Sequence, residues 1–177
     1  MNKIRFGIDL GGTKIEIIGL LVSKSSEKNS AQTPSKMIYQ KRIDTPKGDY
    51  LGTINAIFNL IIHAEKTLSK EYKINLPGLV GIGIPGAISL KTGRIKNANS
   101  VCLIGKDLQG DLQKKLNRPV KLANDANCFA LSEATDGAAQ DANTVFGVII
   151  GTGCGGGIVV NGKILNGLNS IGGEWGH

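Results

Sequence analysis

A strand, a glycine-rich turn and a second strand occur twice in the chain, at an offset of 140 residues. The matching segments are Phe6-Gly7-Ile8 with Phe146-Gly147-Val148, and Leu10-Gly11 with Ile150-Gly151. Two strands joined by a tight turn form an antiparallel hairpin. Two such hairpins, one opening each half, predict two related lobes. The copies differ at one informative position, because Asp9 of the first becomes Ile149 of the second.

The segments between the hairpins alternate between strand and helix patterns. Ile54, Ile57, Phe58 and Ile61 have helical spacing, which predicts an amphipathic helix over 50–69 that packs on a sheet. Asp49 is expected to cap it, and the polar stretch 23–36 is expected to be a loop. Further strands are predicted over 4–10, 15–22, 37–43, 79–84, 119–123, 145–150 and 158–160, and helices over 106–116 and 127–137. This order predicts a layered α/β fold with a mixed sheet.

Composition excludes several classes of protein. No apolar run approaches the ~18–20 residues that span a bilayer, and the first residues lack the apolar region of a signal peptide. The net charge is +7, but the basic residues are scattered and only eight aromatic residues exist, so no surface for stacking RNA bases is predicted. Cys102, Cys128 and Cys154 are an odd number of widely spaced cysteines, which favours free thiols over a disulfide framework. We therefore expect a cytoplasmic protein that binds neither nucleic acid nor a membrane.

Eleven of the 25 glycines lie between Gly147 and Gly176, and residues 151–156 fit the dinucleotide pattern G-x-G-x-x-G. That fingerprint requires a helix directly after the turn and an acidic residue about 20 positions later. Here an apolar strand pattern follows the turn in place of the required helix. The sequence therefore excludes a dinucleotide site of this type.

A glycine-rich hairpin can instead hold phosphate, because glycine lets several backbone N–H groups approach one ligand. Thr13 and Thr152 add hydroxyl donors to the two turns, and Asp9 lies just before the first turn. Mg²⁺ prefers one or two carboxylates together with phosphate oxygens. One hairpin alone would be read as a tight turn without a ligand, whereas two favour a nucleotide held between the lobes.

Two further groups carry potential chemistry. Asp125, directly after a buried strand, is either a helix cap or a general base that accepts the proton of a substrate hydroxyl during phosphoryl transfer. Asn124 is expected to hydrogen-bond a neighbouring hydroxyl. Glu174 and His177 are three residues apart, so they lie on one side of a turn and could bind a metal or polyol hydroxyls. His63 lies within the predicted helix and is expected to be structural.

Together these residues resemble the ROK family of sugar kinases, whose fold is of the actin/hexokinase type. The resemblance rests on five motifs, which are residues 7–14 (GIDLGGTK), 83–86 (GIPG), 122–127 (LANDAN), 151–155 (GTGCG) and 173–177 (GEWGH). Residues 96–100 (KNANS) and Trp175 most resemble the bacterial fructokinase (manno-fructokinase) branch. The resemblance implies a ribonuclease H-like lobe with a mixed sheet over 1–123 and the first part of a related, truncated C-terminal lobe over 124–177.

The resemblance also implies a role for each matching residue. Asp125 is the catalytic base. The loops that hold Mg²⁺ and ATP comprise Asp9, Gly11, Gly12, Thr13 and Lys14 in the first hairpin, and Thr152 and Gly153 in the second. The sugar is bound by Gly86, Ala87, Asn99, Asn124, Asp125, Glu174 and His177. His177 is also a ligand of a structural Zn²⁺ in the family, but the later cysteine-rich segment that completes this site is absent here.

The expected function is an ATP-dependent hexose kinase, with fructose as the sugar. The alternatives are a glucokinase or N-acetylhexosamine kinase of the same family, and, from another class, a non-catalytic sugar-binding fragment or a sugar-responsive regulator. Family regulators carry a helix-turn-helix before the first motif, and only eight residues precede Asp9. The family also implies a homodimer. Its adenosine-binding segment lies downstream, so the isolated chain is expected to be inactive.

Overall fold

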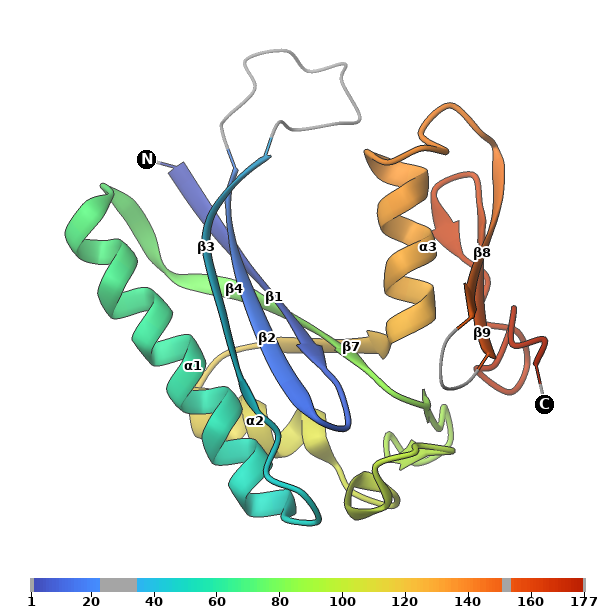
Figure 1. The fold of residues 1–177 in the computed structure, drawn as a ribbon, viewed down its shortest axis with the longest axis horizontal. Helices are drawn as coiled ribbons and strands as arrows, with labels where there is room; N and C mark the ends of the chain where they lie inside the picture. The colour runs from blue at the N-terminus through green and yellow to red at the C-terminus, as the bar shows by residue number, and fades with distance from the viewer. Residues whose placement is uncertain (1, 23–34, 151–153, 177) are drawn as a thin grey trace.

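The computed structural model describes residues 2–22, 35–150 and 154–176, which form two α/β units beside each other (Figure 1). The larger, called here the five-stranded unit, has the strand order β3-β2-β1-β4-β7. Its strands are β1 (Asn2–Leu10), β2 (Lys14–Val22), β3 (Ser35–Asp44), β4 (Ile74–Ile84) and β7 (Val120–Asn124), and its helices are α1 (Tyr50–Glu71) and α2 (Leu108–Leu116). The strands β1, β2 and β3 pair antiparallel, whereas β1–β4 and β4–β7 are parallel, which confirms the predicted mixed sheet.

The smaller, three-stranded unit consists of α3 (Asp125–Thr135), β8 (Thr144–Ile150), β9 (Cys154–Val160) and β10 (Lys163–Ile164). Between β4 and α2, the chain also forms a short hairpin of β5 (Ala87–Ile88) and β6 (Ile95–Lys96) and the 3₁₀ turn η1 (Val101–Leu103). The sequence patterns did not predict β5, β6, η1 or β10. Each is only two or three residues long, too short to show a hydrophobic period.

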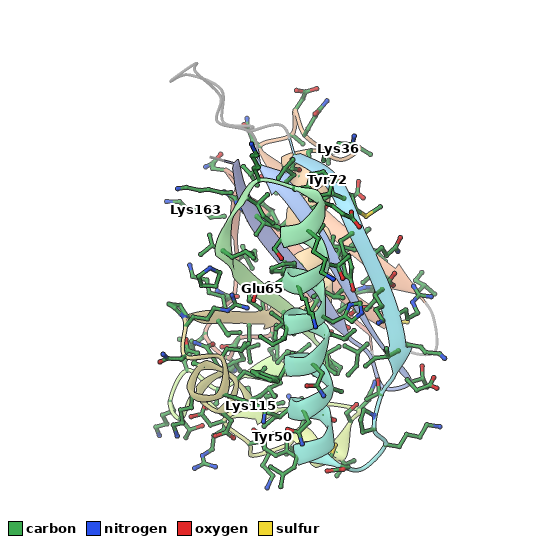
Figure 2. All side chains as sticks on the ribbon, turned by 90° about the vertical axis from the view of Figure 1, so that its left-hand side faces the viewer. Lys36, Tyr50, Glu65, Tyr72, Lys115 and Lys163 are labelled. Carbon is green, nitrogen blue, oxygen red and sulfur yellow. The ribbon has the colours of Figure 1, made fainter. Side chains whose placement is uncertain are left out.

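Helix α1 covers one face of the five-stranded sheet, and Figure 2 views the molecule from this side. Its inward residues Ile57, Ile61 and Leu68 are buried together with Phe6 and Ile8 of β1 in one core. Each such side chain stabilises the fold by roughly 1.5–3 kcal/mol through burial. The predicted cap is confirmed, because the Asp49 carboxylate accepts a hydrogen bond from the Gly52 N–H at 2.8 Å.

A buried ion pair fixes α1 to the sheet. Glu65 of α1 accepts a hydrogen bond from Nη1 of Arg118 at 2.5 Å and another from the N–H of Gly78 at 3.0 Å. Arg118 directly precedes the turn into β7, and Gly78 lies within β4. One carboxylate therefore connects the helix to two neighbouring strands. None of the helices in the described part of the chain is both long and apolar enough to cross a membrane.

Two glycines within strands of the smaller unit allow helix α3 to pack closely against those strands. A Cβ on Gly147 of β8 would lie 2.8 Å from the Cβ of Ala130, and a Cβ on Gly157 of β9 would lie 2.7 Å from the carbonyl of Ala126. Both residues opposite belong to α3, so the helix contacts the strand backbones directly. The prediction of a strand over 158–160 placed its start too late, because β9 begins at Cys154 and includes Gly157.

Both copies of the repeat form antiparallel hairpins, with Gly7 opposite Ile18 and Gly147 opposite Gly157. Their apolar faces differ in what covers them. Phe6 is 2% exposed beneath α1, whereas the equivalent Phe146 is 51% exposed. The outer face of β8 is thus an uncovered apolar surface among the described residues. Of the predicted loop 23–36, Ser35 and Lys36 belong to β3, and 23–34 lie outside the described residues.

Candidate active site

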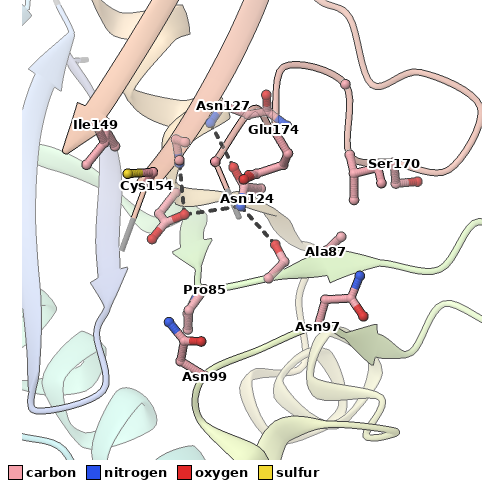
Figure 3. A pocket seen from close by; sticks show the side chains of 17 residues that line it. Pro85, Ala87, Asn97, Asn99, Asn124, Asn127, Ile149, Cys154, Ser170 and Glu174 are labelled. Carbon is pink, nitrogen blue, oxygen red and sulfur yellow. Dashed lines mark hydrogen bonds between the residues drawn. The ribbon is translucent and has the colours of Figure 1, made fainter. Parts of the chain in front are cut away.

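A cleft of about 550 Å³ lies between the two units, where β4 and β7 end and α3 begins (Figure 3). Its wall is formed by the turn after β4, the stretch after β6, the start of α3, the end of β8, the start of β9 and the segment after β10. Every described residue that the sequence assigned to the sugar lines it: Gly86, Ala87, Asn99, Asn124, Asp125 and Glu174. Their roles in binding stay predictions. His177 lies outside the described residues.

Asn124 and Asp125 occupy the junction between β7 and α3. Of the two, Asn124 is the helix cap, because its Oδ1 accepts the N–H of Asn127 at 3.0 Å. Its Nδ2 donates to the carbonyl of Gly86 at 3.0 Å and to Oδ1 of Asp125 at 3.1 Å (Figure 3). The sequence allowed Asp125 to be the helix cap, but the cap of α3 is Asn124. Asn124 also ties the cleft wall at Gly86 to the carboxylate.

The Asp125 carboxylate is held on one side only. Its Oδ1 accepts from Nδ2 of Asn124 and from the N–H of Ala126 at 2.9 Å, whereas no hydrogen bond from the described residues reaches Oδ2. Burial raises the pKa of this carboxyl above its ordinary value of 3.8, although the N–H groups of Ala126 and of Asp125 itself act in the opposite direction. Asp125 thus brings an oriented, partly desolvated carboxylate to the lining of the cleft.

A second carboxylate, that of Asp9, lies near the first. Desolvation raises the pKa of Asp9, and the charge of Asp125 raises it further. The pKa of the Cys128 thiol is raised by burial and then by both carboxylates. Asp9 ends the first hairpin strand and Asp125 begins α3, so the fold brings together two acids that are 116 positions apart in the sequence. Neighbouring carboxyls whose pKa values are both raised are typical of functional sites.

The first glycine turn is braced from outside the hairpin. Gly11 donates its N–H to the carbonyl of Lys14 at 2.9 Å, and the hydroxyl of Thr45 donates to the carbonyl of Gly11 at 2.8 Å. The Lys14 ammonium forms an exposed ion pair with Asp44 of β3. Gly12 and Thr13 are exposed at the tip of the turn, which is where a phosphate could approach. Thr152 and Gly153, assigned to the second phosphate turn, lie outside the described residues.

His177, the one residue of this chain assigned to the zinc site, lies outside the described residues. Within 2–22, 35–150 and 154–176, no group of three or more His, Cys, Asp and Glu side chains could hold a metal ion. The carboxylate of Asp9 suits Mg²⁺ bound together with a phosphorylated ligand, because magnesium takes few protein ligands and keeps phosphate and water oxygens.

Sequence reasoning missed several residues of the cleft wall, among them Asn97, Asn127 and Ser170. Asn97 and Ser170 have positive φ angles of 53° and 58°. A left-handed backbone at a residue other than glycine cannot be read from the sequence. Asn127 could have been found, because it stands two positions after Asp125 at the start of the predicted helix.

Two units, each with a strand–glycine turn–strand hairpin, facing each other across a cleft with paired carboxylates define an actin/hexokinase-type fold. The sequence profile of the ROK family matches residues 5–177. The chain belongs to the ROK family.

Known relatives agree with this assignment. An N-acetyl-D-glucosamine kinase of Yersinia enterocolitica is 41% identical over 172 residues, which cover 97% of this chain and 51% of that protein. A solved ROK family glucokinase of Streptomyces griseus, in complex with glucose and AMPPNP, superposes with a TM-score of 0.76 at 26% identity, covering 100% of this chain and 50% of that one. A ROK hexokinase of Thermus thermophilus gives 0.73 at 28% identity, with coverage of 98% and 51%. The chain thus spans about half the length of these relatives.

Proposed function

We propose that the protein is an ATP-dependent hexose kinase in which Asp125 is the general base. The observation that carries this proposal is the Asp125 carboxylate itself, which lines the cleft and is oriented through the hydrogen bonds to its Oδ1. A general base must lie within hydrogen-bond reach of the proton it removes and must be oriented beforehand. Asn124 and the first turn of α3 provide that orientation.

In the proposed reaction, a sugar hydroxyl in the cleft gives its proton to Oδ2 of Asp125. The hydroxyl oxygen forms a bond to the γ-phosphorus of ATP while the bond from that phosphorus to the β,γ-bridging oxygen breaks, which releases ADP. The exposed N–H groups of the first glycine turn would hold the phosphates, and Asp9 would hold Mg²⁺. The metal, when bound, neutralises charge on the phosphate oxygens. Asn99 and Glu174 would bind the other sugar hydroxyls.

N-acetyl-D-glucosamine is the sugar that we propose first. The sequence pointed to fructose through residues 96–100 and Trp175, but the relatives reported above are named for N-acetyl-D-glucosamine, glucose and hexoses. The first of these relatives is 41% identical to this chain, against 26% and 28% for the two solved kinases. Glucose is the next candidate, and fructose is retained as the test of the sequence-based expectation.

Other expectations rest on the family resemblance or, for the cytoplasmic location, on composition. Those from the resemblance are the homodimer, the structural Zn²⁺, the lobe boundary between residues 123 and 124, and the inactivity of the 177-residue chain by itself. They remain predictions.

The function is tested by a coupled kinase assay of the full-length protein with N-acetyl-D-glucosamine, glucose, mannose and fructose. We expect ADP release that depends on sugar, with the highest kcat/KM for N-acetyl-D-glucosamine. Calorimetric titration of the 177-residue chain with sugar and with ATP separates the alternative class. Sugar binding in a full-length protein that transfers no phosphoryl group to any of these sugars would indicate a binding module or regulator.

The raised pKa of Asp125 predicts opposite effects of acid on activity and on stability. A general base must be ionised, so kcat/KM should fall as the pH drops through a value above 3.8. A carboxyl whose pKa is raised by folding stabilises the fold when protonated, and this contribution is complete below 3.8 and lost as the pH rises through the raised pKa. The difference in unfolding free energy between wild type and Asp125→Asn, measured from pH 3.5 to 7, reports this effect together with the influence of the Asp125 charge on Asp9. A difference that does not change with pH would contradict the raised pKa of Asp125.

A further inference from the structure

A lysine of the five-stranded unit reaches across to the segment that follows β10. The ammonium of Lys96, at the end of β6, donates a hydrogen bond to the carbonyl of Asn169 at 2.8 Å. The two residues are 73 positions apart in the chain. The side chain of Lys96 is half-buried, and none of the three ion pairs found among the described residues involves it. Among the described residues, the hydrogen-bond partner of the Lys96 ammonium is therefore the backbone carbonyl of Asn169.

Cleft-lining residues flank this contact on both sides. Asn97 and Asn99 follow Lys96 directly, and Ser170 and Glu174 follow Asn169. Figure 3 shows Asn97 and Ser170 on opposite sides of the cleft opening. The hydrogen bond thus joins the two walls of the cleft at a place away from Asp125.

The backbone next to the contact is held in a conformation that needs support. Asn97 and Ser170 are left-handed, with φ of 53° and 58°, a region that side chains other than glycine enter at a free-energy cost. Beyond the contact, the N–H of Gly172 donates to the carbonyl of Asn166 at 2.9 Å, which closes the segment into a compact turn. Hydrogen bonds from a charged donor are stronger than neutral ones, so Lys96 is suited to fix this turn.

We propose that Lys96 is a positioning residue that sets the place of the segment 165–176, and with it Glu174, relative to the wall formed by residues 86–99. This inference rests on the proposed function, because the purpose of the fixed segment is to bind sugar. Lys96 does not line the cleft and takes no part in phosphoryl transfer. Its loss should weaken sugar binding and leave the chemistry at Asp125 unchanged.

The first test is Lys96→Met, which removes the ammonium and keeps an unbranched apolar side chain. In the 177-residue chain, hydrogen exchange of the amides in 165–172 should become at least several-fold faster. Lys91→Met is the matched control, because Lys91 is an exposed lysine in the turn between β5 and β6. Lys96→Arg keeps a charged donor and should restore slow exchange. Exchange that is unchanged in Lys96→Met would overturn the proposal, and this readout does not depend on any kinase activity.

The second test uses the full-length protein with the sugar that gives the highest kcat/KM. Lys96→Met should raise the sugar KM about tenfold, or ~1.4 kcal/mol, because a segment that is no longer held in place must be ordered when the sugar binds. The KM for ATP and kcat should change by less than about twofold, and Lys96→Arg should recover most of the sugar KM. A drop in kcat at unchanged sugar KM would overturn the positioning role. Absence of activity in the wild type would instead contradict the proposed function, while the exchange experiment would still decide the role of Lys96.

Discussion

Replacing Asp125 with asparagine should lower kcat of the full-length protein by roughly 10²- to 10⁴-fold, the range that a general base contributes. Asparagine has nearly the same shape and still offers Oδ1 to the N–H of Ala126, which the aspartate accepts at 2.9 Å. It cannot accept a proton at neutral pH. Sugar affinity, measured by calorimetry, should therefore change by less than about threefold while turnover, measured by ADP release, nearly disappears.

Stability separates this loss of chemistry from unfolding. Burial penalises the charged form of Asp125, and the charge of Asp125 raises the pKa of Asp9. The neutral amide removes both effects, so the melting temperature of Asp125→Asn at pH 7 should equal or exceed that of the wild type. Asp136→Asn, at the other end of α3, is the matched control and should retain normal turnover. Turnover of Asp125→Asn within tenfold of wild type would contradict the assignment of the base.

The second large effect is expected at Gly86, which lies in the turn between β4 and β5. Its φ is +86°, and an added Cβ would lie 2.6 Å from the carbonyl oxygen of Lys96 and 2.8 Å from the nitrogen of Ala98. Left-handed strain and overpacking each cost about 1–3 kcal/mol, so Gly86→Ala should lower the free energy of unfolding by roughly 2–6 kcal/mol. Denaturant unfolding of the 177-residue chain measures this change.

Gly48 provides the control for Gly86. It also has a positive φ, of 68°, but nothing lies within 4 Å of an added Cβ. Gly48→Ala should therefore show the strain without the overlap and cost only about 1–2 kcal/mol. Because the Gly86 carbonyl accepts from Asn124 at 3.0 Å, Gly86→Ala should also weaken sugar binding, whereas Gly48→Ala should not. Equal losses of stability in the two variants would show that the close approach at Gly86 does not matter.

Much of the fold could be predicted because its signals are local. The repeated hairpins follow from apolar runs interrupted by glycine, and α1 follows from helical spacing and the cap at Asp49. The short hairpin of β5 and β6 was missed because each of its strands is only two residues long, too short to show a hydrophobic period. The amide of Asn124 and the carboxylate of Asp125 could both cap a helix, and only the backbone geometry at the end of β7 selects Asn124.

The residues that line the cleft could be predicted from the sequence, but the hydrogen bonds between them could not. The motifs placed Gly86, Asn99, Asp125 and Glu174 at the sugar, and the structure brings these residues to one cleft. No local pattern reveals that the Asn124 amide links Gly86 to Asp125, or that Lys96 holds the carbonyl of Asn169. Such links depend on how two units meet, and this is determined by packing over the whole chain.

The most direct test of the central claim, that the cleft at Asp125 transfers a phosphoryl group to a hexose, is to follow the products by ³¹P NMR. The full-length protein is incubated with Mg²⁺, ATP and N-acetyl-D-glucosamine. We predict that the wild type forms ADP and a sugar phosphate in equal amounts, and that Asp125→Asn forms neither over the same time. Equal rates of sugar phosphate formation in the two proteins, or ADP with inorganic phosphate as the only other product, would contradict the account.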